Sequence, residues 1–324
     1  MPKRTPPETI TPLSTRLFPR DMGADAYSIT GIAKRCDWVV LSDHRQPHTH
    51  LVQHKERHPR HIFVSLRVPR TGLHCFADEI LPRLSEPFIL ITGSEDATLP
   101  HQVDVRQQPF RPQEHKCLST ILNHPLLKHW FIENLDTANW SPKVSPLPVG
   151  FVWTDPANAD RGIQVPRTVR LFNRRLRMLC AHRTREGGQW QQRRDVTAMA
   201  RAHWSDFCTV IEDPVSEEEF TTLMQSHAFV LCVEGGGLDP SPKAWQTILN
   251  GAIPIIRKNG PHKAYEQLPV IMVEQWSADQ ISEDRLIEHR NSKIFDFDTI
   301  SGRNKTLERL GIEYWWQQIE SAGK

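Results

Sequence analysis

The segment from residue 229 to residue 256 constrains the fold more than any other part of the chain. Residues 229–233 form an apolar run with the length of a buried strand, and an acidic residue and three glycines follow it. Residues 243–250 have a helical pattern, Gly251 ends it, and residues 253–256 form a second apolar run. A strand, a glycine-rich turn, a helix and a further strand make one parallel crossover unit. The segment therefore predicts a parallel α/β sheet.

The turn inside this unit is suited to binding a ligand. In parallel sheets, ligands lie at the carboxyl ends of strands, where the turns meet the N-termini of helices. Gly235, Gly236 and Gly237 leave no Cβ on the turn, so a ligand can approach the backbone closely. An ordinary flexible turn is the alternative interpretation.

Short apolar runs alternate with helical patterns through the rest of the chain. In the first half we expect strands at residues 37–42, 61–67, 88–92, 130–134 and 144–148, and helices at 76–84, 115–123 and 126–129. In the second half we expect strands at 177–181, 207–211 and 270–273, and helices at 189–203 and after Ser216. Ser216 and Glu219 have the spacing of a capping box. The alternation predicts an α/β fold with two Rossmann-like domains facing a cleft.

Four segments are expected along the chain. A stretch with little periodicity, residues 154–166, indicates a linker between the two halves. The expected segments are a loose N-terminal piece at 1–25, Rossmann-like domains at 26–155 and 156–300, and a C-terminal amphipathic helix at 301–324.

Composition excludes several classes of protein. The chain has 324 residues and a net charge of +2, with its basic residues scattered, which disfavours a nucleic-acid-binding protein. No apolar run approaches the roughly 18 residues of a membrane span, and the first twenty residues do not form a secretory signal. The six cysteines lack metal or redox spacing, so we expect free thiols and a reducing, cytoplasmic location.

Other nucleotide-binding motifs are incomplete. The sequence after Gly235 lacks the third glycine of a dinucleotide-binding turn, which disfavours a dehydrogenase. A phosphate-binding loop with a Walker lysine is absent from the sequence as well.

The residues around the turn resemble the donor-site segment of exostosin-like glycosyltransferases. That family has a Gly-x-Gly-x-Asp turn, a basic residue, Trp-Glu and then Gly-x-Ile-Pro-Val. The positions that fall on this pattern are Gly235, Gly237, Asp239, Lys243, Trp245, Gly251, Ile253 and Pro254. The resemblance extends over residues 88–275 and is strong across 216–256.

The resemblance implies a metal-independent glycosyltransferase of GT-B architecture. The N-terminal domain would hold a glycan or glycolipid acceptor, and the C-terminal domain a nucleotide-sugar donor. The nucleotide sugar would be a co-substrate, and no other cofactor is expected.

The resemblance also implies the residues of the donor site. They are Arg183, Glu234, Gly235, Gly236, Gly237, Asp239, Lys243, Trp245 and Gln246. Backbone N–H groups of the turn, with Arg183 and Lys243, would stabilise the leaving diphosphate. Asp239 would accept from sugar hydroxyls or cap the next helix, and Trp245 would stack near the base or pack in the core.

Position 246 departs from the family pattern. Gln246 stands where the family carries a glutamate, and a neutral amide accepts weaker hydrogen bonds than a carboxylate. The alternative function is therefore a degenerate transferase that binds a nucleotide sugar or a glycan without turnover.

An acceptor hydroxyl must also lose a proton, and we expect the base in the first domain. Asp96, which follows the strand at 88–92, is the first candidate for the catalytic base. Glu95 and His101 are close alternatives, and Asp43 and His44 have the same relation to the first strand.

A run of histidines between residues 44 and 61 is the one candidate for a metal site. His50 and His54 would share the face of a helix, but no acidic residue stands at the position that a zinc-binding motif requires. We therefore interpret this run as a polar surface segment and expect no metal.

Overall fold

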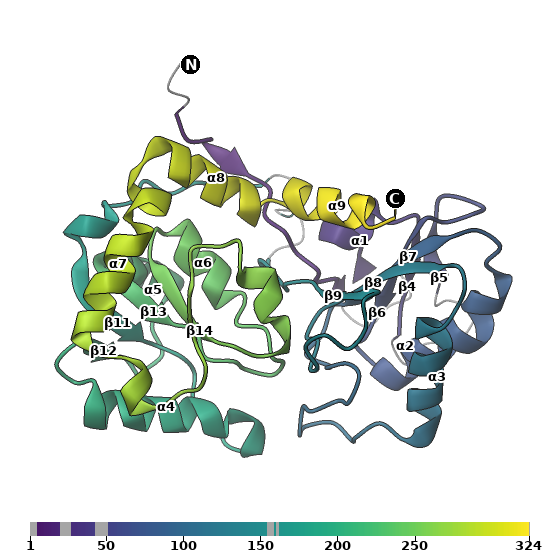
Figure 1. Cartoon of the computed structure of the whole chain (residues 1–324), viewed down its shortest axis with the longest axis horizontal. Coiled ribbons are helices and arrows are strands. Elements are labelled where there is room, and N and C mark those ends of the chain that lie inside the picture. The colour runs from purple at the N-terminus through teal and green to yellow at the C-terminus, as the bar shows by residue number, and fades with distance from the viewer. Residues whose placement is uncertain (1–4, 20–26, 43–50, 154–158, 160–161, 324) are drawn as a thin grey trace.

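Two α/β domains lie side by side in the computed structural model (Figure 1). It describes residues 5–19, 27–42, 51–153, 159 and 162–323. Each domain has its own sheet, and helices cover both sheets. The predicted class, α/β with two parallel-sheet, Rossmann-like domains, is confirmed.

The first domain contains a six-stranded sheet. Its strands are β4 (Trp38–Val40), β5 (Leu51–His54), β6 (His61–Ser65), β7 (Phe88–Gly93), β8 (Leu127–Ile132) and β9 (Val144–Pro146). They lie in the order β5-β4-β6-β7-β8-β9, and all neighbours are parallel except β5, which pairs antiparallel with β4. Its helices are α1 (Gly31–Arg35), α2 (Pro69–His74), the π-helix η2 (Cys75–Ile80), the 3-10 helix η3 (Leu81–Arg83) and α3 (Pro112–Leu122).

The second domain contains a five-stranded, fully parallel sheet. Its strands are β11 (Arg175–Cys180), β12 (Cys208–Val210), β13 (His227–Leu231), β14 (Ile253–Arg257) and β15 (Ile271–Val273). They lie in the order β12-β11-β13-β14-β15. Its helices are α4 (Gln191–His203), α5 (Glu217–Ser226), α6 (Lys243–Leu249) and α7 (Glu283–Asp298), with 3-10 turns η5 (Leu171–Asn173), η6 (Gly188–Trp190), η7 (Gly260–Tyr265) and η8 (Ala278–Gln280).

The predicted crossover unit is present as β13, α6 and β14. Every residue of β13 is buried, as expected for a strand covered on both faces. Gly251 follows α6 with a φ of 79°, a conformation that favours glycine. Ser216 caps α5 by accepting from the backbone N–H of Glu219 at 3.1 Å.

One local prediction is corrected by the structure. Residues 126–129, predicted as a short helix, belong mainly to β8, where exposed Lys128 interrupts the apolar pattern. His54, from the histidine run at 44–61, lies in strand β5. Asp43, His44 and His50 lie outside the described residues.

The N-terminal segment is packed rather than loose over residues 9–17. Leu13, Ser14 and Thr15 are fully buried. β1 (Thr9–Ile10) pairs with β10 (Ile163–Gln164), at the end of the stretch expected to be a linker. Short strands β2 (Phe18–Pro19) and β3 (Tyr27–Ser28) pair with each other.

Two helices, α8 (Ile300–Leu310) and α9 (Ile312–Ser321), replace the single helix predicted at the C-terminus. Gly311 separates them, and α8 lies over the second domain while α9 lies over the first (Figure 1). The backbone N–H of Leu13 donates to the Leu310 carbonyl at 2.9 Å, so both ends of the chain hold the domains together. None of the described helices is long and apolar enough to span a bilayer.

Candidate functional site

The glycine turn after β13 contacts the first domain. A Cβ on Gly236 would lie 1.8 Å from Oδ2 of Asp96, and a Cβ on Gly237 would lie 2.3 Å from Oδ1 of Asn134. The same Asn134 oxygen accepts from the backbone N–H groups of Leu238 and Asp239, at 2.8 and 2.9 Å. The missing side chains therefore let the two domains approach each other.

This packing corrects the expected role of the turn. Gly236 and Gly237 are buried, and Gly235 lies against the Arg193 guanidinium, where a Cβ would be 2.5 Å from Nη2. Two of the N–H groups that follow the glycines are already bonded to Asn134. In this conformation the turn is a domain contact, and its backbone does not present a cradle for a diphosphate.

Glu234 is held by protein groups. Its carboxylate accepts from Nε of Arg257 at 2.7 Å, Nδ2 of Asn259 at 3.1 Å and Nε1 of Trp276 at 3.0 Å. The carboxylate thus fixes β14 and the loop after β15 to the end of β13, and the residue is buried.

Asp239 is buried and does not cap α6. Its carboxylate accepts from the hydroxyl of Tyr265 at 2.6 Å and from the N–H groups of Ser241 at 2.7 Å and Val149 at 3.3 Å. Pro242, which has no side-chain acceptor, occupies the N-cap position of α6. Asp239 therefore fastens the turn to the end of the first domain.

Trp245 belongs to the core of the second domain. Its side chain is 1 % exposed, and Nε1 donates to the Leu310 carbonyl at 3.1 Å. The burial leaves no face of the ring for a nucleotide base. Gln246 is partly buried on α6 and does not line the basic cavity described next.

A basic cavity of about 680 Å³ lies at the carboxyl ends of β11 and β12, beside the N-terminus of α5. Its cations are Arg183, Arg185, Arg193 and Lys243. Within the described part of the chain, none of the four forms a salt bridge, in contrast to fourteen carboxylate pairs elsewhere such as that of Arg257.

Lys243 is the most deeply placed of these cations. Its Nζ donates to the Ala181 carbonyl at 2.7 Å and lies 5.9 Å from the ring centroid of Phe220. Burial lowers the pKa of Lys243 to about 8, because the charged form loses its hydration.

Three arginines pack against the ring of Trp190. Arg185 and Arg193 lie 4.9 and 5.1 Å from the ring centroid, and Arg106 of the first domain lies at 5.4 Å. Arg193 also donates from Nε to the Glu234 carbonyl at 3.0 Å. The cavity also has a partly acidic rim, formed by Glu212, Asp213 and Glu217.

Sequence reasoning identified half of the basic set. Arg183 and Lys243 were predicted, and the structure brings both to one cavity. Arg185 and Arg193 were missed, although the alternating His182-Arg-Thr-Arg185 segment directly after β11 was a usable signal for the first of them.

Asp96 faces the second domain, on the loop where it was predicted. Its carboxylate accepts from Arg16 at 3.2 Å and from Arg106 at 2.8 Å. Burial alone would raise the pKa of Asp96, but the two guanidinium groups outweigh it and hold the pKa below its ordinary value. Asp96 is therefore ionised and engaged with two cations.

The alternative bases differ in their surroundings. Glu95 lies 3.7 Å from Arg16. His101 is mostly exposed, and its Nδ1 lies 3.0 Å from the Asp136 carboxylate.

Glu133, at the end of β8, is an acid that the sequence analysis missed. It is fully buried, lies 3.1 Å from Arg16, and accepts from the Ser94 N–H at 2.8 Å and from the Thr15 hydroxyl. Burial raises the pKa of Glu133 to about 7 against the opposing effect of these partners. Its position directly after an apolar run was the available signal.

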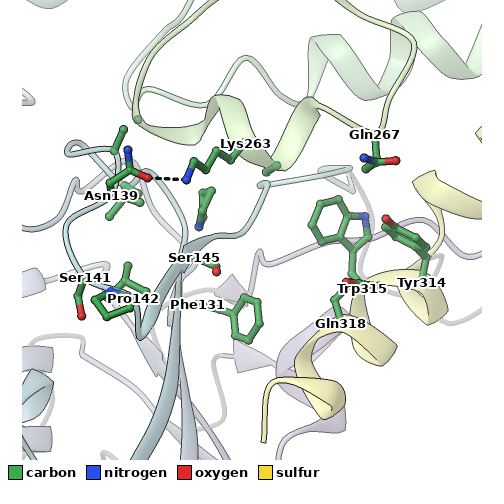
Figure 2. Close-up of a pocket in the computed structure, with 16 residues that line it drawn as sticks. Phe131, Asn139, Ser141, Pro142, Ser145, Lys263, Gln267, Tyr314, Trp315 and Gln318 are labelled. Atoms are coloured by element: carbon green, nitrogen blue, oxygen red, sulfur yellow. Dashed lines mark hydrogen bonds between the residues drawn. The ribbon is translucent and has the colours of Figure 1, made fainter.

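A second cavity, of about 600 Å³, lies between the edge of the first sheet, η7 and α9 (Figure 2). Trp315 and Tyr314 form one wall, and Phe131 lies at its base. Its cation, Lys263, donates to the side-chain oxygen of Asn139. With one cation among its lining residues, this cavity is less suited to an anion than the basic cavity.

Comparisons with solved structures find similar arrangements at low identity. The crystal structure of a GtfA/B complex aligns with a TM-score of 0.36 and 10 % identity, over 81 % of this chain and 57 % of that chain. The apo structure of OtsA aligns with a TM-score of 0.43 and 9 % identity, over 82 % and 72 % of the two chains. A sucrose-phosphate synthase from Thermosynechococcus elongatus aligns with a TM-score of 0.39 and 11 % identity, over 81 % of this chain and 72 % of that chain.

These structures are of the GT-B glycosyltransferase type. Their low scores and identities assign no substrate or reaction to this chain, whose fold follows from its own strands and helices. This chain spans little more than half the length of the GtfA/B chain. No protein-family model matches the sequence, and no curated protein matches it either.

Proposed function

We propose that this protein is a metal-independent glycosyltransferase of the exostosin-like type, which binds the diphosphate of a nucleotide sugar in the basic cavity. The observation that carries the proposal is the set of four cations at the strand ends, without carboxylate partners among the described residues. Uncompensated charge in a half-enclosed site is costly unless a ligand of opposite sign neutralises it. A diphosphate supplies that charge, and the N-terminus of α5 adds a favourable dipole.

The four cations have different parts in this proposal. Lys243, fixed by the Ala181 carbonyl, is placed to contact a phosphate without a large change of conformation. Arg183 and Arg185 are exposed at the rim and free to fold over the ligand. Together they would stabilise the negative charge that develops on the leaving diphosphate, as an oxyanion site does.

Glycosyl transfer also needs a base, for which Asp96 remains the candidate. It points at the glycine turn across the domain boundary, where an acceptor hydroxyl and a donor sugar would meet. Arg16 and Arg106 keep the carboxylate ionised, and losing their contacts would raise its pKa and make it a stronger base. In the closed arrangement Asp96 contacts Gly236, so the domains must separate before a sugar can enter.

The acceptor that we propose is a glycan or glycolipid held by the first domain. A reducing, cytoplasmic location is part of the same proposal, because all six cysteines are free and buried.

The second candidate is a protein that binds the nucleotide sugar without turnover. Gln246 in place of the family's glutamate motivates it. The variant Gln246→Glu distinguishes the two candidates. A gain in transfer rate favours an active enzyme whose donor binding is weakened by the glutamine. No gain in donor affinity or transfer rate argues against a degenerate transferase inactivated at position 246.

The test of the proposed function is a thermal-shift screen with UDP, GDP, CDP, ADP and their sugars. A ligand that binds only the folded state raises the melting temperature according to its affinity. We expect one nucleotide to stabilise the protein and its sugar to be transferred or hydrolysed. The double variant Arg183→Ala/Arg185→Ala should lose this stabilisation, whereas Arg175→Ala, at the opposite end of β11, should retain it. Equal stabilisation of both variants would contradict the assignment of the cavity.

A further inference from the structure

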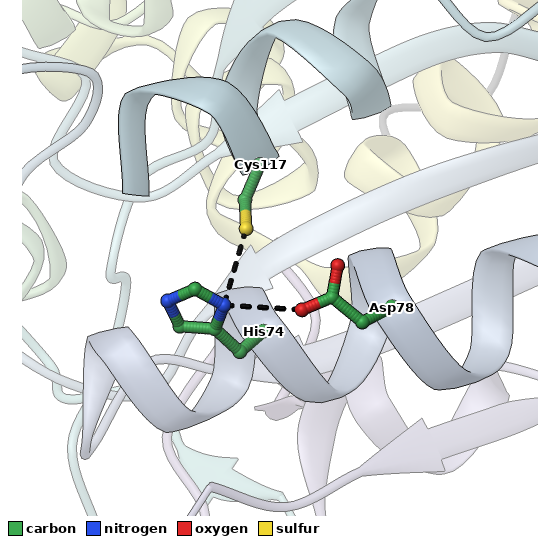
Figure 3. Close-up of side chains that lie close together, drawn as sticks. All are labelled: His74, Asp78 and Cys117. Carbon is green, nitrogen blue, oxygen red and sulfur yellow. Dashed lines mark hydrogen bonds and ion pairs between the residues drawn. The ribbon is translucent and has the colours of Figure 1, made fainter. Parts of the chain in front are cut away.

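A cluster of three potential metal ligands lies on the helical side of the first domain (Figure 3). His74 ends α2, Asp78 lies one turn later in η2, and Cys117 comes from α3. The imidazole Nδ1 of His74 lies 3.1 Å from Oδ2 of Asp78 and 3.4 Å from Sγ of Cys117. Figure 3 shows both side chains pointing at that one nitrogen.

These separations fit a tetrahedral zinc ion. With ordinary Zn–N, Zn–O and Zn–S bond lengths, ligand atoms lie about 3.4–3.6 Å apart. All three ligand atoms of the cluster lie within 4.8 Å of one another. The Asp78 side chain is exposed, and its ligand oxygen lies within 4.8 Å of the Cys117 sulfur.

Glu114 supplies an independent indication of a metal site. It is 3 % exposed, and its Oε1 lies 3.2 Å from Nε2 of His74. A carboxylate on the far nitrogen of an imidazole fixes the tautomer in which the near nitrogen is a lone-pair donor, which is the usual second contact of a metal-bound histidine. Glu114 is itself oriented by the Arg111 N–H at 2.7 Å.

The local backbone also supports a functional origin. Residues Cys75–Ile80 form a π-helix, and π-helical turns are rare and occur frequently at functional sites. Here the wider turn begins directly after His74 and contains Asp78, so it sets the relation between these two side chains.

We propose that His74, Asp78 and Cys117 bind a Zn²⁺-like divalent ion, with water in the fourth position. The ion would fasten η2 to α3, and the thiol proton of Cys117 would be released to solvent on binding. The site lies on elements other than those of the basic cavity, so it is independent of the proposed glycosyl transfer. An imidazolium held between two carboxylates is the arrangement without an ion.

The experiment is Co²⁺ titration of the intact, metal-stripped protein, followed by Zn²⁺ competition. We expect one equivalent of Co²⁺ to produce a thiolate-to-cobalt charge-transfer band, which Zn²⁺ abolishes. Cys117→Ser should remove the band, and Asp78→Asn should weaken Zn²⁺ binding at least tenfold. Glu79→Gln, which removes the adjacent charge, and Cys75→Ala, which removes the adjacent thiol, should leave both readouts unchanged.

Two results would overturn the proposal. One is wild-type protein, shown to be folded by circular dichroism, that binds Co²⁺ without a thiolate band. The other is a band that persists in folded Cys117→Ser or disappears in Cys75→Ala. If Cys117→Ser does not fold, the wild-type spectrum and the Asp78→Asn titration decide the question. Nucleotide stabilisation should survive removal of the ion, which separates this proposal from the proposed function.

Discussion

The strand ends of the two domains carry charge in opposite ways. In the first domain, Arg16 and Arg106 lie at the carboxyl edge of the sheet and are surrounded by acids: Glu95, Asp96, Asp104 and Glu133. In the second domain, Arg185, Arg193 and Lys243 contact carbonyl groups or an aromatic ring. None of the four cations of the basic cavity has a salt bridge among the described residues.

This contrast separates a structural set of charges from one that is available to a ligand. Both arginines of the first domain are neutralised internally, and Arg16 holds the N-terminal segment against the end of the sheet. Under the proposed function, an anion from outside the chain neutralises the cations of the basic cavity. The net charge of +2 conceals this division, which only the positions of the charges reveal.

Among the variants that test this comparison, we expect the largest loss of stability for Arg16→Ala. The substitution leaves Glu133 buried without its cation, and breaking a buried pair in this way costs about 3–5 kcal/mol. Urea denaturation should show that loss in the free energy of unfolding. Arg35→Ala, which removes a pair with Glu313 at the surface, should cost less than about 1 kcal/mol. Equal losses in the two variants would show that the acids around Arg16 are not a buried network.

The pH dependence of stability tests the charges of the first domain further, through Glu133. The pKa of Glu133 is about 7 in the folded protein and 4.5 ordinarily, so the folded state binds this proton more tightly than the unfolded chain. Protonated Glu133 therefore contributes fully to the free energy of unfolding below about pH 4.5. This contribution is lost as the pH rises through about 7, which lowers the free energy of unfolding by roughly 3 kcal/mol. Glu133→Gln should flatten this fall in urea titrations at several pH values. Exposed Glu266→Gln should preserve it, and an unchanged slope in Glu133→Gln would contradict the account.

The second domain is tested by Lys243→Met. Losing a charge-assisted contact of about 2–3 kcal/mol should weaken binding of the stabilising nucleoside diphosphate roughly 30- to 150-fold, measured by calorimetry. The pKa of Lys243 is about 8, so its charge is present below that pH and is lost above it. Wild-type affinity should therefore fall as the pH rises from about 7 to 9, and Lys243→Met should show no such fall. A variant with wild-type affinity at neutral pH would remove Lys243 from the site.

The smallest of these effects concerns the contact between the two regions. Gly236→Ala places a Cβ where Asp96 and Arg106 now lie, and this crowding should cost about 1–3 kcal/mol or hold the domains apart. Urea denaturation measures the first outcome and small-angle scattering the second. Gly188→Ala, whose Cβ would meet only Val105 at 3.7 Å, is the matched control. No change in either measurement would mean that the domains do not close on Gly236 in solution.

The sequence predicted the fold where apolar runs were continuous. The run that became β13 and the glycine at position 251 were sufficient to place the crossover unit. The prediction failed at β8, because Lys128 and His129 interrupt the apolar pattern at a place where the strand is only partly covered. It also placed the start of the helical segment after β6 at residue 76, although α2 begins at Pro69 and a proline at the first helical position was a usable signal.

The site was predictable only in part, for a different physical reason. Arg183 follows β11 and Lys243 begins the helix after β13, so topology places both at the carboxyl edge of the sheet. The contact of Asn134 with the residues after Gly237 joins positions about a hundred apart, and no local pattern encodes it. Burial likewise decides that Trp245 and Asp239 are structural, and burial of a single side chain depends on the whole fold.

The most direct test of the central claim is a crystal structure with the nucleoside diphosphate that stabilises the protein most. Both phosphates should lie in the basic cavity, with a phosphate oxygen in hydrogen-bond contact with Lys243 and at least one of Arg183 and Arg185. A nucleotide bound instead in the aromatic cavity beside Trp315, or bound with its phosphates away from Lys243, would contradict it.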